Sequence, residues 1–298
     1  MRLLITGGNG LLGSNLIRYF LGAPGWEVVA TSLSQPAVSP PVDFIFGDLA
    51  DPLFVGTLVA ETMPDIVINT VALVDIDKCE NEPELASRVN VVTAKNLAKA
   101  IAGTDRRLIH VSTDHLFDGG KPFNTEDDRP APVNNYGRTK LEAERVCLEN
   151  HADTAVIRTN FYGWCRGINR PNFGEWMYKS LRDKAPIKLF TDYYYTPIEV
   201  DHLAPALELV AKSDFTGVIN IAGSERVSKY DFGASMAEAF GFSLENVTPI
   251  PLDPGAFTVP RQPDLSLSSD KFIKVFNRSL PKMKEGLALF KETVPEII

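Results

Sequence analysis

A tyrosine and a lysine stand four positions apart in the segment Tyr136–Lys140, and in a helix this spacing places both side chains on one face. A free tyrosine keeps its proton up to a pKa of about 10, which is too high for ready proton transfer at neutral pH. A neighbouring lysine cation, helped by the charge of an oxidised nicotinamide, lowers that pKa because it favours the phenolate. The pair could therefore supply the proton that a carbonyl oxygen takes up when hydride adds to its carbon.

A hydroxyl that could hold the same carbonyl oxygen follows the apolar segment Arg107–Ser112. We predict a strand there, and ligands of parallel α/β sheets bind at the carboxyl ends of the strands. Thr113 is the hydroxyl that we expect to hydrogen-bond the carbonyl, with Ser112 as the alternative. A Tyr-x-x-x-Lys pattern alone occurs often by chance. The predicted catalytic set of Thr113, Tyr136 and Lys140 therefore depends on all three occurring in this order, after a phosphate-binding loop.

That loop is expected at the start of the chain, where the apolar segment Arg2–Thr6 leads into glycines and a helical pattern opens. Gly7, Gly10 and Gly13 fit one glycine template, and Gly8 with the last two fits a second. Glycine permits the tight turn, lets the backbone approach a pyrophosphate and allows close packing of helix on strand. The helix N-terminus then offers free N–H groups to the phosphates. We predict a dinucleotide-binding loop.

The residues that would contact the adenosine leave the choice of cofactor open. An acidic side chain after the second strand accepts from the 2′-hydroxyl of NAD, whereas an arginine suits the 2′-phosphate of NADP. This chain has Thr31–Ser34 there, with neither. Hydroxyls such as that of Ser32 can bind a phosphate, so we favour NADP and keep NAD as the alternative. Asp48, after the third predicted strand, could accept from the adenine amino group or could only cap its loop.

Short apolar segments alternate with longer amphipathic ones through the first half of the chain. Strands rich in Ile and Val between helices are typical of a parallel sheet buried on both faces, the doubly wound α/β class. From about Gly163 the alternation breaks down. We predict a Rossmann-type domain over residues 1–165, joined again by 196–223, and a smaller, partly discontinuous substrate-binding lobe formed by 166–195 and 224–298. Expected strands are Arg2–Thr6, Glu27–Ala30, Phe44–Phe46, Ile66–Asn69, Arg107–Ser112, Thr154–Arg158 and Val218–Ala222; expected helices are Leu11–Phe20, Phe54–Thr62, Glu84–Ile101, Tyr136–His151 and Val200–Ala211.

Charge and composition exclude several classes of protein. A formal net charge of −8 argues against a nucleic-acid or anionic-membrane partner, since both need clustered Lys and Arg. Three cysteines without disulfide or metal spacing indicate reduced thiols in a cytoplasmic protein. Four histidines share no metal-ligand spacing, so we predict no metal site. No segment reaches membrane-spanning length or has the pattern of a signal peptide.

Several stretches resemble the extended short-chain dehydrogenases/reductases, and most closely the dTDP-4-dehydrorhamnose reductase group, over nearly the whole chain. They are Asp75–Glu80, Glu82–Ala86, Val89–Asn90, Ser112–Gly119, Asn135–Glu144 and Arg158–Thr159. The resemblance implies a reductase that delivers hydride to C4 of a nucleotide-linked 4-keto-6-deoxysugar, with the second lobe holding the sugar nucleotide. A homodimer is a further expectation that stays open. Together with the glycine pattern, the resemblance gives a cofactor-binding set of Gly7, Gly10, Leu11, Leu12, Gly13, Ser32, Asp48, Leu49, Val71, Ala72, Leu73, Asn90, Tyr136 and Lys140.

The chain departs from that group at positions that would meet substrate. The group usually has Ala-Ala-His-Thr where this chain has Val71–Val74, Tyr where it has His115, and Trp where it has Phe161. These changes leave cofactor chemistry intact and leave the substrate undetermined. The substrate-binding residues that we predict are Asp114, His115, Phe161, Asn172 and Tyr195.

Two other readings stay open. A sugar-nucleotide epimerase or dehydratase could use the same fold, although dehydratases of the extended type add Asp-Glu beside the catalytic threonine and here Thr113 is followed by Asp114 and His115. A non-catalytic cofactor-binding regulator is the alternative from another class, since the β subunit of methionine adenosyltransferase belongs to the same reductase-like group. An intact Thr113, Tyr136 and Lys140 set argues mildly against it.

Overall fold

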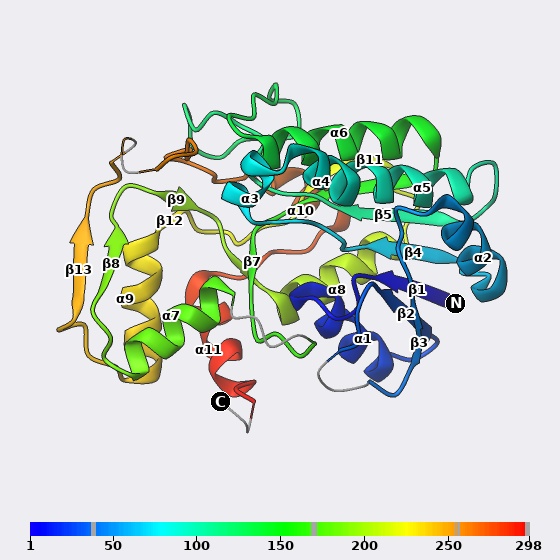
Figure 1. Ribbon diagram of the computed structural model, residues 1–298. Helices are drawn as coiled ribbons and strands as arrows, with labels where there is room; N and C mark the ends of the chain where they lie inside the picture. Colours follow the sequence, from blue (N-terminus) through cyan, green and yellow to red (C-terminus); the bar gives the residue numbers. More distant parts are fainter. Residues whose placement is uncertain (37–39, 168–171, 254, 256, 296–298) are drawn as a thin grey trace.

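The structure, a computed structural model, describes residues 1–36, 40–167, 172–253, 255 and 257–295. A seven-stranded parallel sheet runs through its larger part, on the right in Figure 1. Across the sheet the order is β3-β2-β1-β4-β5-β6-β11, so the direction of winding reverses beside β1. The predicted doubly wound α/β fold is confirmed. Its strands are β1 (Arg2–Thr6), β2 (Glu27–Ser32), β3 (Asp43–Phe46), β4 (Ile66–Asn69), β5 (Arg107–Val111), β6 (Thr154–Arg158) and β11 (Gly217–Asn220).

Helices cover both faces of this sheet, because alternate residues of a buried strand point to opposite sides. In β1, Leu3 and Ile5 pack with residues of α1 (Leu11–Gly22) and α8 (Val200–Ala211). Leu4 between them packs with residues of the helices on the other face (Figure 1), which are α2 (Pro52–Thr62), α5 (Thr93–Ala100) and α6 (Asn135–Asn150). The two cores hold the strand ends in fixed positions.

The helix predicted over Glu84–Ile101 is present, with one π-helical turn inside it. It begins at Pro83, because proline lacks the backbone N–H that a helix interior uses and so starts a new helix after α3 (Ile76–Asn81). Its parts follow one another without a gap as α4 (Pro83–Ser87), η1 (Arg88–Val92) and α5. A π-helical turn often marks a functional site.

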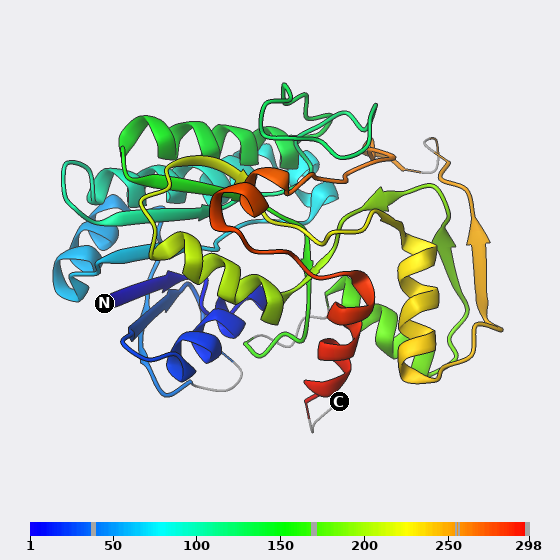
Figure 2. The same cartoon turned by 180° about the vertical axis from the view of Figure 1, so that it is seen from behind.

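The smaller part of the molecule, on the left in Figure 1, has its own core rich in aromatic side chains. Figure 2 shows that the chain leaves this part after β13, forms α10 against the sheet and returns to it as α11. The residue boundaries that we propose for the two domains stay a prediction. The smaller part of the molecule and its connections to the sheet comprise β7 (Phe161–Tyr162), α7 (Phe173–Arg182), β8 (Ile187–Phe190), β9 (Tyr194–Tyr195), β10 (Ile198–Glu199), β12 (Val227–Ser228), α9 (Lys229–Phe240), β13 (Val247–Ile250), α10 (Asp270–Phe276) and α11 (Met283–Glu292).

Helix α7 was not expected from the sequence, yet its start carries a recognisable signal. Asn172 accepts hydrogen bonds from the backbone of Gly174 and Glu175, and the Glu175 carboxylate accepts from the Asn172 backbone. This reciprocal capping box follows from an Asn with a Glu three residues later. Within the described ranges, the helices are all too short or too polar to cross a bilayer.

Candidate active site

The glycine segment folds as a tight loop between β1 and α1. Gly7 has a φ of 69°, which favours glycine, and its carbonyl accepts from the Gly10 amide at 2.9 Å. A Cβ on Gly13 would collide with that same carbonyl. No side chain caps the helix at Gly10, so the N–H groups at the start of α1 face the loop. Leu11 and Leu12 form the first helical turn, and this cradle fits a diphosphate.

Residues 31–36, at and after the end of β2, carry hydroxyl and amide side chains and no carboxylate. The Ser32 hydroxyl donates to the Ser34 carbonyl, and the Asn9 side chain donates to the Ser34 carbonyl and hydroxyl at 2.9 and 3.0 Å. Ser32 itself is buried, so Ser34 and Asn9 are the more accessible groups. Sequence analysis did not single out these two residues.

Asp48 caps its own loop, which was the alternative to a role in binding adenine. Its carboxylate accepts from the Ala50 amide and forms a 2.6 Å ion pair with Arg88, and these contacts lower its pKa, the amide most. The neighbouring Leu49 is buried in the core beneath α5. A role of Asp48 toward adenine stays a prediction.

Asn90 supports the segment Val71–Leu73 instead of facing an open space. It lies in the π-helical turn, is fully buried, and its side chain accepts from the Leu73 amide at 2.7 Å and donates to the Leu73 carbonyl. It also donates to the Thr139 hydroxyl on α6 at 2.9 Å. The turn therefore joins the segment after β4 to the helix that carries Tyr136.

A crevice of about 210 Å³ lies where the ends of β4, β5 and β6 meet α1 and α6. This is the carboxyl edge beside the reversal of strand order, where ligands of this fold bind. Eight predicted site residues line it, from six separate places in the chain. They are Leu12, Ala72, Thr113, Asp114, His115, Tyr136, Lys140 and Phe161.

Tyr136 and Thr113 meet in this crevice. Both side chains are largely buried, and a hydrogen-bonding interaction with Thr113 counteracts part of the effect of burial on Tyr136. Burial dominates, however, and raises the pKa of Tyr136 above its ordinary value. The phenol therefore holds its proton at neutral pH, as a proton donor must.

Lys140 is not among the groups that shift the pKa of Tyr136 in this structure. The expectation that this lysine and an oxidised nicotinamide together favour the phenolate stays a prediction. The Lys140 ammonium points away along the sheet: Nζ donates to the Val111 carbonyl at 2.7 Å and lies 3.5 Å from Nε2 of His110. Burial lowers the pKa of Lys140 itself to about 8. The helical spacing was right, but local spacing did not reveal what the lysine would contact.

The predicted substrate residues after β5 are close to the phenol. The His115 ring packs edge to face with Tyr136, with 5.4 Å between centroids, and burial lowers the pKa of His115. Asp114 is buried and accepts from the Asn160 amide at 2.6 Å. Phe161, half-buried, also lines the crevice. Asn160 was not among the predicted substrate residues, although it contacts Asp114.

Asn172 and Tyr195 lie outside this crevice in the described lining. Asn172 is committed to capping α7 and donates to the Gly163 carbonyl at 2.9 Å, which is a structural role. The buried Tyr195 ring lies 3.2 Å from Nζ of Lys229, which also lies 4.4 Å from the ring of Phe173. Sequence analysis missed Lys229, because only the fold brings it among aromatic rings.

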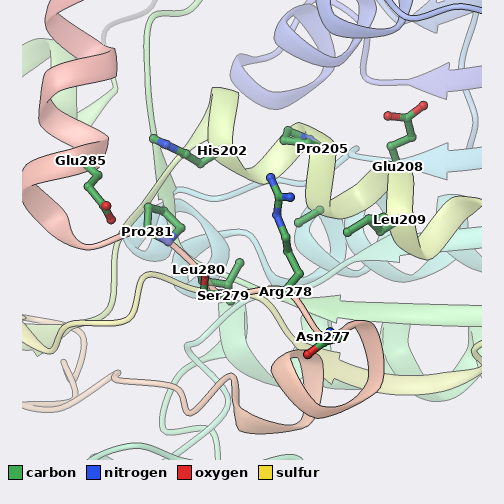
Figure 3. A pocket seen from close by; sticks show the side chains of 11 residues that line it. His202, Pro205, Glu208, Leu209, Asn277, Arg278, Ser279, Leu280, Pro281 and Glu285 are labelled. Atoms are coloured by element: carbon green, nitrogen blue, oxygen red, sulfur yellow. The ribbon is translucent and has the colours of Figure 1, made fainter.

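A larger cavity, of about 520 Å³, lies elsewhere, between α8 and the segment before α11 (Figure 3). His202 and Glu208 come from α8, Glu285 from α11, and Arg278 extends from the connecting segment toward α8. The described residues that line it include none of the predicted site residues. Within the described ranges, no three His, Cys, Asp or Glu side chains gather as a metal site would need.

Comparison with known proteins decides the family. Residues 1–295 match the model of the RmlD substrate binding domain family. The chain belongs to this family. A dTDP-4-dehydrorhamnose reductase of Mycolicibacterium smegmatis is 33% identical over 291 residues, covering 96% of this chain and 84% of that protein.

Other relatives of this family member differ in the role that their names give. A probable low-salt glycan biosynthesis reductase, Agl14 of Haloferax volcanii, is 33% identical over 245 residues, 81% of each chain. Methionine adenosyltransferase 2 subunit beta of Xenopus laevis is also 33% identical, covering 90% of this chain and 80% of that protein.

Solved structures support the fold. The dTDP-4-dehydrorhamnose reductase of Bacillus anthracis in complex with NADP gives a TM-score of 0.87 at 23% identity, covering 98% of this chain and 99% of that one. MoeE5 in complex with UDP-glucuronic acid and NAD gives 0.83 at 22% identity, covering 98% of both. The predicted family is confirmed, and at family level so is the expectation of an oxidoreductase. The roles of single residues stay predictions.

Proposed function

We propose that this RmlD family member is an NAD(P)H-dependent reductase of a nucleotide-linked 4-keto-6-deoxysugar, with Tyr136 as the proton donor. The observation that carries the proposal is the crevice at the carboxyl edge of the sheet. It holds Thr113 and the Tyr136–Lys140 pair beside Leu12 of the glycine loop, although these three segments are separate in the chain.

The glycine loop supports a dinucleotide cofactor. Its tight turn at Gly7 and the uncapped start of α1 offer backbone N–H groups to a diphosphate. Residues 31–36 carry no carboxylate that would repel a 2′-phosphate, and Ser34 and Asn9 offer polar groups to it. NADP is therefore favoured over NAD. When bound, the reduced nicotinamide supplies the hydride.

The side chains of the crevice supply the remaining chemistry. The Thr113 hydroxyl hydrogen-bonds the carbonyl oxygen of the substrate, and Tyr136 gives its proton to that oxygen as the carbonyl carbon becomes a CH–OH carbon. Because burial raises the pKa of Tyr136, the phenol is protonated before the reaction. His115 and Phe161 enclose the sugar, and Asn160 fixes Asp114 beside it.

Oxidation of NADPH and NADH with dTDP-4-keto-6-deoxysugars, followed by the absorbance of the reduced nicotinamide, tests this function. We expect turnover with the keto sugar, and a loss of about 10²–10⁴-fold in Tyr136→Phe with little change in cofactor affinity. Tyr178→Phe is the matched control, because Tyr178 packs against Trp164 away from the crevice. Full activity in Tyr136→Phe would refute the role of the phenol.

The similarity to methionine adenosyltransferase 2 subunit beta supports a second candidate, a cofactor-binding regulatory subunit. Tight dinucleotide binding without turnover of any keto sugar would favour that candidate. Sedimentation of the purified chain would test the predicted homodimer in the same preparation.

A further inference from the structure

A row of polar side chains crosses the buried centre of the sheet. Thr6 of β1, Asn69 of β4 and His110 of β5 are register partners on neighbouring strands, and all three are fully buried. Their side chains are hydrogen-bonded in sequence: Thr6 Oγ1 to Asn69 Oδ1 at 2.7 Å, and Asn69 Nδ2 to His110 Nδ1 at 3.0 Å. The row ends at Lys140, whose Nζ lies 3.5 Å from His110 Nε2.

The orientation of the Asn69 amide is fixed by a group that can only donate. The backbone N–H of Val71 points at Asn69 Oδ1 at 3.1 Å, so this atom must be the oxygen. Its partner Nδ2 therefore faces His110, and Nδ2 carries only hydrogens to donate. Nδ1 of His110 must then accept, because two donors facing each other in a buried site leave both unsatisfied.

This acceptor role decides which ring nitrogen of His110 holds the hydrogen. A neutral imidazole has one N–H and one unprotonated nitrogen, so accepting at Nδ1 places the hydrogen on Nε2. That hydrogen points at Lys140. A lysine ammonium also has only donors, whereas the uncharged amine has a lone pair that can accept. The Lys140 amine can accept from Nε2–H while it still donates to the Val111 carbonyl.

We propose that His110, held by Asn69, is a positioning residue that presents Nε2–H to Lys140 and so favours the uncharged amine of this lysine. Its catalytic meaning rests on the proposed function, since Lys140 belongs to the crevice of Tyr136. A lysine whose charge is adjustable near neutral pH can take up and release a proton there, which a permanent cation cannot.

Two neighbouring groups favour the charged form of Lys140, and burial outweighs them. Glu144, one turn along α6, favours the charged lysine, but its carboxylate is held by a buried ion pair with Arg158 at 2.8 Å. Cys147 acts in the same direction, and burial raises the pKa of that thiol to about 12. Burial outweighs both and sets the pKa of Lys140 at about 8, while burial first and Lys140 second lower the pKa of His110.

Nitrogen NMR of ¹⁵N-histidine tests the proposal without any assay of turnover. The chain has four histidines, and His110→Gln identifies the resonances of His110. Should that variant not fold, replacement of His115, His151 and His202 gives the same assignment. We expect the hydrogen on Nε2 and no protonation over about pH 5–8, the range in which an ordinary histidine titrates. A hydrogen on Nδ1 overturns the proposal.

Asn69→Asp is the sharper variant, because a carboxylate keeps the shape and still accepts from the Val71 amide. It also accepts from His110, so the hydrogen should move to Nδ1 and Nε2 should then accept from Lys140. We expect the pKa of Lys140, followed by NMR of labelled lysine and assigned with Lys140→Met, to rise by roughly one unit or more. Thr6→Val, which alters the same row but not the amide, should leave both the tautomer and the pKa of Lys140 unchanged.

An unmoved tautomer or an unmoved pKa of Lys140 in Asn69→Asp overturns the proposal. If Asn69→Asp does not fold, the tautomer of His110 in the native protein decides, because the proposal needs the hydrogen on Nε2 and a hydrogen on Nδ1 overturns it. An absence of reductase turnover, in contrast, would refute the proposed function and leave these measurements untouched.

Discussion

Two lysines with lowered pKa values, Lys140 and Lys229, are stabilised by different surroundings. Lys140, in the larger part of the molecule, is fully buried and has hydrogen-bonding partners, the Val111 carbonyl and His110. Lys229, in the smaller part, is half-buried among the rings of Phe173, Tyr193 and Tyr195. Among the described residues, no carboxylate lies within ion-pair distance of its ammonium. Burial lowers both pKa values, to about 8 for Lys140 and about 7 for Lys229.

The difference shows what each region depends on. Lys140 and its neighbours His110 and Asn69 are joined by specific hydrogen bonds, so the removal of one member leaves another buried and unsatisfied. Around Lys229, ring faces attract the cation without directional hydrogen bonds, and a substitution there leaves no unpaired acceptor. The first region should therefore be sensitive to single substitutions and the second tolerant of them.

The largest expected effect in the first region is on the ion pair that joins α6 to β6. In Glu144→Ala, Arg158 stays behind as a buried charge without its partner, and we expect a loss of about 3–5 kcal/mol in the free energy of unfolding. Denaturant unfolding measures it. Glu142→Ala, two residues earlier in α6, removes an exposed pair with Arg145 and should cost less than about 1 kcal/mol. Equal losses in both variants would contradict the comparison.

Glu199 extends the comparison to a buried carboxyl group at the junction of the two parts. Burial raises its pKa from 4.5 to about 8, so between these values the folded state binds more protons than the unfolded state. Stability should therefore fall as the pH rises from about 5 to about 8, by on the order of 3 kcal/mol. Unfolding at a series of pH values should show this slope in the native protein and lose it in Glu199→Gln. The same slope in both proteins would assign it to other groups.

The sequence predicted features that depend on local patterns and missed those that depend on residues distant in the chain. The glycine loop, the strands and the Thr113, Tyr136 and Lys140 set are local patterns, and the structure brings them to one crevice. The helix start at Pro83 and the capping box of α7 also had local signals. The direction of the Tyr136 pKa shift and the surroundings of Lys229 did not, because both depend on burial and on residues distant in the chain.

A smaller effect is expected for Lys140→Met. Methionine fills the space of the lysine stem but leaves the Val111 carbonyl without its donor, and an unsatisfied buried acceptor costs about 1–3 kcal/mol. Thermal and denaturant unfolding at neutral pH give this difference. If Lys140→Met is as stable as the native protein, the hydrogen bond to Val111 contributes nothing to stability. The region around Lys140 is then less sensitive to single substitutions than we infer.

The smallest effect should come from Lys229→Met, measured by the same unfolding experiments. The variant loses a cation–π attraction of about 0.5–2 kcal/mol, but it also removes the cost of holding a poorly hydrated charge among aromatic rings. These terms oppose each other, so the net change at neutral pH should stay within about 1 kcal/mol. Because the folded pKa of Lys229 is below its unfolded value, the native protein gains stability as the pH rises through about 7 to 10, and Lys229→Met should lose part of that gain. A loss as large as that of Glu144→Ala would mean that an anionic partner of Lys229 stabilises the fold, and the contrast between the two lysines would then disappear.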